Sequence, residues 1–101
     1  MPTPTSIATE AAGFVKKTPA NGTISMIYGK VKDGYPIVNY EYAIVNSTQS
    51  SSSTAKDIRS VLEWIVDAKD GNATSYLNQV NFQPLPISIG AASLKQIKTI
   101  Q

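Results

Sequence analysis

Residues Tyr35 to Val45 read YPIVNYEYAIV and form the longest apolar and aromatic run in the chain. β-Branched and aromatic residues of this kind fit the pleated, half-buried surface of a sheet. Side chains alternate between the two faces of a strand, so one face here would be wholly apolar or aromatic and the other mixed. The first face would carry Val38, Tyr40, Tyr42 and Ile44, and the second Ile37, Asn39, Glu41, Ala43 and Val45. The run therefore predicts a central β-strand with one well-covered face.

The tyrosines of this run allow two interpretations. Tyr35, Tyr40 and Tyr42 suit packing within a sheet, where each hydroxyl group would reach a polar partner. They would also suit a platform on which a ligand stacks. No other feature of a binding site lies near them in the sequence, and this favours packing.

A second, shorter strand is predicted from Thr23 to Tyr28, ahead of a polar loop from Gly29 to Gly34. Spacing alone predicts that this strand and the central one form an antiparallel hairpin. Pro36 has no N–H group to donate to a ladder, so it is expected among the first residues of the central strand.

Amphipathic spacing predicts helices around these strands. The clearest one begins at Thr54, which would cap it together with Asp57, and stops at Gly71 in a left-handed conformation. Three more are expected at residues 7–17 (capped by Thr5 or Ser6), 72–80 and 88–100. The expected fold class is therefore α+β or α/β, with a central strand pair and three to four flanking helices.

The composition excludes several classes of function. The chain has 101 residues with no cysteine and no histidine, so disulfides, Cys or His metal sites and His-based triads are ruled out. A net charge of +2 without a basic cluster argues against nucleic-acid binding. No run is long enough to span a membrane, and MPTPTSIATE lacks the regions of an export signal. A single domain of this length is expected to bury about 65% of its unfolded surface.

The stretch Ser50–Thr54 is a candidate anion site, because a hydroxyl-rich loop before a helix can present N–H groups to phosphate. It lacks the glycines of a phosphate-binding loop, so a solvated linker with a helix cap is the preferred interpretation. Glu41 stands in mid-strand, where a carboxylate needs a partner, and a structural contact is expected for it.

Acidic residues at helical spacing form another candidate. Glu63, Asp67 and Asp70 could perform acid–base chemistry, but such a group is more often a solvated surface. Arg59 is expected to form a surface ion pair with Glu63, one turn further on. Since no nucleophile stands beside a base, no catalytic residue is assigned and an enzyme is not expected.

Three Asn-X-Ser/Thr sequons begin at Asn21, Asn46 and Asn72. All three are predicted in loops, as N-glycosylation requires. In a chain so rich in Asn, Ser and Thr, chance is the preferred explanation for them.

Several pieces of the sequence follow one another in an order that resembles a known family. The most specific are YPIVNYEYAIVN and QVNFQPLP, with Trp64 and Gly71 between them, and the likeness extends from Ser6 to Gln101. Together they resemble the C-terminal part of the phosphate-binding protein of the phosphate-specific ABC importer.

The resemblance implies a type II periplasmic-binding fold, in which two α/β lobes close on phosphate at a hinge. Residues 1–33 would end the second lobe, residues 34–38 would cross the hinge, and residues 39–101 would complete the first lobe. The two predicted strands would then lie in or between different lobes, which leaves open whether they pair as a hairpin.

The resemblance also implies a non-catalytic role in phosphate uptake outside the cytoplasm, with the membrane permease of the importer as partner. The family's phosphate ligands belong to earlier stretches of its sequence, so no phosphate-binding residue and no cofactor is assigned here. Inorganic phosphate would bind only with the missing lobe segments. A stand-alone structural or interaction module is the alternative, and the isolated chain is expected to be marginally stable or to self-associate.

Overall fold

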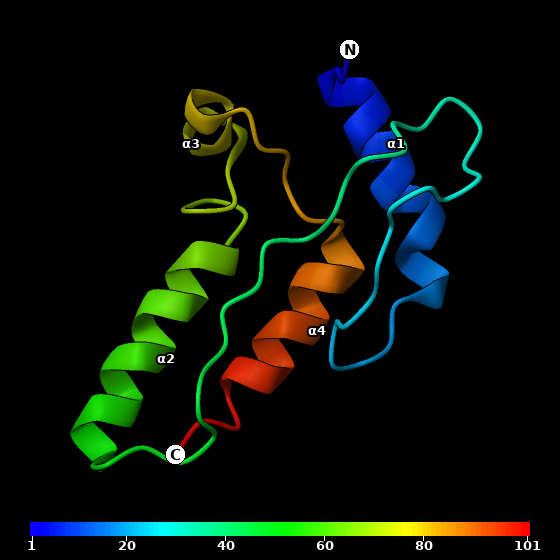
Figure 1. Ribbon diagram of the computed structural model, residues 1–101. Coiled ribbons are helices and arrows are strands. Elements are labelled where there is room, and N and C mark those ends of the chain that lie inside the picture. The colour runs from blue at the N-terminus through cyan, green and yellow to red at the C-terminus, as the bar shows by residue number, and fades with distance from the viewer.

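A computed structural model describes all 101 residues as short helices joined by long irregular segments, with no β-strand (Figure 1). The helices are α1 (Pro4–Phe14), which continues into the 3-10 turn η1 (Val15–Lys17), α2 (Ser52–Val66), α3 (Thr74–Leu77), followed by the 3-10 turn η2 (Asn78–Val80), and α4 (Ile87–Ile97). None of them is both long and apolar enough to cross a membrane.

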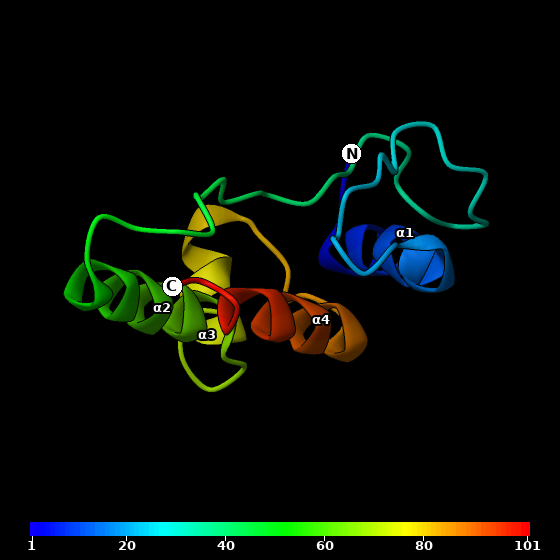
Figure 2. The same ribbon diagram turned by 90° about the horizontal axis from the view of Figure 1, so that it is seen from below.

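The helices and the long connection between α1 and α2 occupy opposite sides of the molecule. Helices α1, α2 and α4 lie in one layer, and the connection passes along one side of that layer (Figure 2). Within the layer, α2 packs against α4. The part of the connection from Ile37 to Val45, here named the extended segment, has no regular structure and runs over α2 and α4.

The predicted hairpin is wrong as β-structure, although its two halves do run side by side in opposite directions. Only Tyr28 donates a backbone hydrogen bond across the pair, to the carbonyl of Pro36 at 2.7 Å. The N–H of Met26 bonds instead to Asn39 Oδ1 at 3.4 Å, and the N–H of Ile24 to the Tyr42 hydroxyl at 3.2 Å. These side-chain acceptors replace a backbone ladder, and a lone two-stranded pair is marginally stable in water in any case.

The predicted α+β or α/β class is therefore wrong for this chain. Without a sheet, the structure has neither the central strand pair nor the lobes of a type II periplasmic-binding fold. A strand becomes stable only when neighbours complete its hydrogen bonds and cover its apolar face. The extended segment has the composition of a strand, but its neighbours meet it through side chains and do not complete its backbone hydrogen bonds.

The helices match their predictions except at the ends. Ser51 caps α2, accepting a hydrogen bond from the N–H of Thr54 at 3.1 Å, so the cap is three residues earlier than predicted. Gly71 does not provide a left-handed stop, because α2 already ends at Val66 and the next residue is extended. Gly71 instead packs against α2, where an added β-carbon would lie 2.8 Å from the Cα of Ile65.

Helix α1 begins three residues earlier than predicted. Thr3 caps it through a reciprocal pair of hydrogen bonds with Ser6, and Pro4 takes the first helical position, where its missing N–H costs nothing. The predicted last turn, through Lys17, exists as the 3-10 turn η1.

Two small cores hold the chain together. Ala11, Phe14 and Met26 form the first, and Ile89, Ile97 and Ile100 are buried on and just after α4, which packs on α2. Only 9 of the 101 residues are buried, and 7160 Å² of surface stays accessible. A compact monomer of 10.8 kDa is expected to expose about 5,500 Å². The chain therefore buries about 54% of its unfolded surface instead of the predicted 65%.

Candidate functional site

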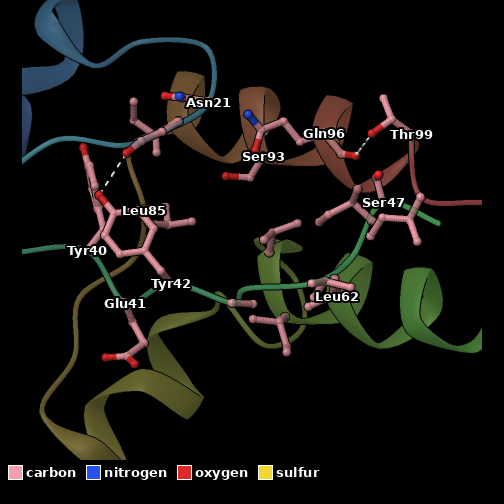
Figure 3. A pocket seen from close by; sticks show the side chains of 18 residues that line it. Asn21, Tyr40, Glu41, Tyr42, Ser47, Leu62, Leu85, Ser93, Gln96 and Thr99 are labelled. Carbon is pink, nitrogen blue, oxygen red and sulfur yellow. Dashed lines mark hydrogen bonds between the residues drawn. The ribbon is translucent and has the colours of Figure 1, made fainter. Parts of the chain in front are cut away.

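A cleft of about 470 Å³ separates the extended segment from the helix layer (Figure 3). One wall is the chain from Tyr40 to Ser47, and the others are helices α2 and α4. Eleven of its 18 lining residues are hydrophobic. The lining combines residues of the extended segment with residues of α2, α4 and the chain before α4: Tyr40, Glu41, Tyr42, Val45, Leu62, Ile65, Val66, Leu85, Ile89, Ser93, Gln96 and Ile97.

The apolar floor of the cleft comes from the two packed helices. Leu62, Ile65 and Val66 line it from α2, and Ile89 and Ile97 from α4. Residues three, four and eight positions apart share one face of a helix, so this floor is the face that the amphipathic pattern presents. Ile89 and Ile97 are buried, whereas Ile65 is still 48% exposed, so the floor is covered only in part.

Three of the polar groups around the cleft donate hydrogen bonds to backbone carbonyls of the chain. The Tyr42 hydroxyl donates to the carbonyl of Gly22 at 2.9 Å, the Gln96 amide to the carbonyl of Ala20 at 2.8 Å, and the Thr99 hydroxyl to the carbonyl of Gln96 at 2.7 Å. The carboxylate of Glu41 points away from Ser93 and Gln96 (Figure 3). No set of polar groups converges on one point, so the cleft suits an apolar occupant better than an anion.

Tyr40 is an exception among these polar groups. Its hydroxyl oxygen is buried and has no hydrogen-bond partner. Burial raises the pKa of Tyr40, the nearby Thr18 side chain opposes that rise, and Tyr42 adds slightly to it. The Thr18 hydroxyl itself donates to the carbonyl of Phe14. Tyr40 and Tyr42 meet edge to face at 6.4 Å, so packing is the role that the structure supports for them.

The backbone of the extended segment is the least satisfied part of the molecule. No N–H or C=O group from Ile37 to Val45 takes part in an intramolecular hydrogen bond. Ile37 is 58% exposed and Ile44 98% exposed, so large apolar side chains of the segment also face solvent. Free backbone groups beside an apolar groove are the features by which proteins bind an added β-strand.

Hydroxyl groups of the predicted anion loop, Ser50–Thr54, cap helix α2. The Ser51 hydroxyl accepts from the N–H of Thr54 and lies 3.0 Å from the Thr54 hydroxyl, so both hydroxyl groups serve the cap of α2. The predicted pair between Arg59 and Glu63 is absent, because Arg59 donates to the carbonyl of Ile100. That bond ties α2 to the end of the chain.

The acidic residues do not come together as one group. Glu63 and Asp67 border a second cleft, of about 460 Å³, between the end of α2 and the start of α4, with Lys98 on its other side. Asp70 lies outside it. Asp67 accepts the N–H of Lys69 at 2.8 Å, so its carboxylate closes a turn. No three acidic side chains are placed to hold a metal ion.

The sequons differ in accessibility. All three asparagines lie outside the helices, as predicted, and Asn21 and Asn46 are exposed. Asn72 is only 9% exposed, and its Oδ1 accepts the N–H of Leu85 at 2.9 Å. A glycan at Asn72 would therefore break a buried contact.

Glu10 is a residue that sequence reasoning missed. Its side chain is fully buried, and neither carboxylate oxygen has a hydrogen-bond partner. Gly29 and Gly34 lie so close to it that a β-carbon on either would clash with the carboxylate. A lone Glu on the apolar side of a predicted helix was the only signal available. The comparison with known protein families finds none that matches the chain.

Proposed function

We propose that this chain is a C-terminal segment of an extracytoplasmic phosphate-binding protein that serves an ABC-type phosphate importer. Its role is solute binding without catalysis, and the groups that hold phosphate come from other parts of the protein. The sequence support is the order of YPIVNYEYAIVN, Trp64, Gly71 and QVNFQPLP. Because the chain by itself is helical, the proposal concerns its role and not a two-lobed architecture.

The structural observation that supports this proposal is the incomplete cleft. The apolar floor on α2 and α4 is only partly covered, since Ile65 is exposed, and the extended segment beside it has free backbone groups from Ile37 to Val45. Buried polar groups and apolar faces are normally completed within a folded unit. A chain that leaves both incomplete is best explained as a part of a larger fold, and the polar side chains that line the cleft do not converge on one point to hold an oxyanion.

Titration calorimetry with inorganic phosphate tests the proposal, with sulfate as the control anion. The 101-residue chain is expected to give no heat at micromolar phosphate. The product of the complete reading frame, including any coding sequence upstream of Met1, is expected to bind phosphate. The proposal would be refuted if the 101-residue chain alone bound phosphate at micromolar concentration. It would also be refuted if the product of the complete reading frame did not bind phosphate.

The free backbone groups from Ile37 to Val45 also favour a second role. The chain could act as an interaction module that binds other polypeptides and no phosphate. The two roles differ in the titration of the complete product, because only the first predicts heat with phosphate.

A further inference from the structure

We propose that the cleft beneath the extended segment binds the extended segment of a second copy of this chain, so that the chain forms a two-fold symmetric dimer. The two segments would pair as antiparallel β-strands along Ile37–Val45. This inference goes beyond the phosphate role and does not depend on it.

The backbone chemistry selects a strand as the occupant. Nine consecutive residues, Ile37 to Val45, keep their N–H and C=O groups free of intramolecular hydrogen bonds. A small apolar ligand would fill the groove but leave these groups without protein partners. An added strand pairs with the backbone groups along one edge of the segment and supplies side chains to the floor in one step.

The exposed area is sufficient for such a partner. The chain exposes 7160 Å², which is about 1,600 Å² more than a compact monomer of its mass. A stable interface needs about 800 Å² from each partner. Part of the excess lies where pairing would occur, since Ile44 is 98% exposed and Ile65, on the floor, is 48% exposed, although other exposed apolar side chains such as Ile87 lie elsewhere.

The segment is complementary to itself when the two-fold axis passes through Tyr42. Antiparallel pairing then sets Tyr40 opposite Ile44 twice and Tyr42 opposite its own copy, and such aromatic and β-branched pairs are favourable across strands. Glu41 is the only charged residue of the segment, and in this register it faces Ala43. The two carboxylates therefore do not oppose one another, as they would with the axis at Glu41.

Sedimentation equilibrium tests the proposal at about 100 µM protein, because oligomerisation depends on concentration. The expected mass is twice the 10.8 kDa of one chain. The variant Ile44→Lys is expected to raise the dimer dissociation constant about tenfold. The matched control is Ile87→Lys, since Ile87 is also an almost fully exposed isoleucine, at 94%, but lies at the start of α4. The control is expected to leave the constant unchanged.

Amide hydrogen exchange supplies a second measurement that does not rely on a variant. On raising the protein concentration, protection is expected to increase at alternate residues between Ile37 and Val45. Far-ultraviolet circular dichroism checks that both lysine variants keep their helices. A monomeric mass at this concentration, equal weakening by the two lysine variants, or new protection confined to other segments would each overturn the proposal.

Discussion

Replacing the buried carboxylate of Glu10 should stabilise the chain. Glu10 lies on α1 with none of its surface exposed, and neither oxygen has a hydrogen-bond partner. Folding therefore removes a carboxylate from water without giving it a replacement for the lost hydration. Glu10→Gln removes the charge and keeps the shape, whereas Glu10→Met removes the polar atoms as well.

The magnitude follows from the cost of a buried polar group without a partner. That cost is about 1–3 kcal/mol for a neutral group and larger for a charged one. We expect Glu10→Gln to raise the free energy of unfolding by about 1 kcal/mol or more, and Glu10→Met by about 2–3 kcal/mol. In a domain of about this size each kcal/mol moves the melting temperature by about 4–8 °C.

Thermal unfolding followed by circular dichroism at a fixed protein concentration measures these differences. Asp57→Asn is the matched control, because Asp57 is exposed on α2 and the change also removes one negative charge. The control should stay within about 0.5 kcal/mol of the original chain. If Glu10→Gln lowers the melting temperature while the control does not, the carboxylate has a stabilising partner and the reasoning fails.

Three further predictions concern single positions. Gly71→Ala should destabilise the chain by about 1–3 kcal/mol, because the added β-carbon would press on the α2 backbone. Gly90 lies inside α4 with space around it, so Gly90→Ala should stabilise the chain by about 0.5–1 kcal/mol. Urea titrations of the two variants measure both changes. Tyr40 has a raised pKa in the folded chain, so its contribution to stability is present below about pH 10 and is lost as the pH rises further. Tyr40→Phe should therefore reduce the loss of stability that melting curves show at alkaline pH. Ser51→Ala should cost about 1 kcal/mol of stability through the lost cap of α2, and Ser53→Ala, in the first turn of the same helix, should cost clearly less in the same melting assay.

The helices were predictable because their signals are local. The spacing of apolar residues in α2 and α4 determines which face can be buried, and Ile89, Ile97 and Ile100 of that pattern are buried. Trp64, at the border of the α2 faces, is 47% exposed and meets Tyr76 edge to face. The predicted capping residues were wrong because several neighbouring Ser and Thr residues are equally able to cap a helix. Only the backbone geometry determines which of them does so.

The strands were not predictable from composition. A sequence such as YPIVNYEYAIV has the composition of a strand, but a strand also needs a backbone ladder, which the neighbouring residues 24–28 do not form with it. Asn39 and Tyr42 illustrate the difference, because their side chains accept N–H groups that a ladder would have used. The fold class depended on those long-range contacts and was wrong for that reason.

The amino-acid sequence by itself determined the helices, their apolar faces and the absence of cysteine and histidine chemistry, since each follows from residues close together in the chain. Only the tertiary structure decided that Glu10 is buried without a partner and that α2 and α4 form the floor of an open cleft. It also decided that Ile37–Val45 stays unpaired. These features join residues distant in sequence, and their free energies depend on which surfaces meet, which no local pattern specifies.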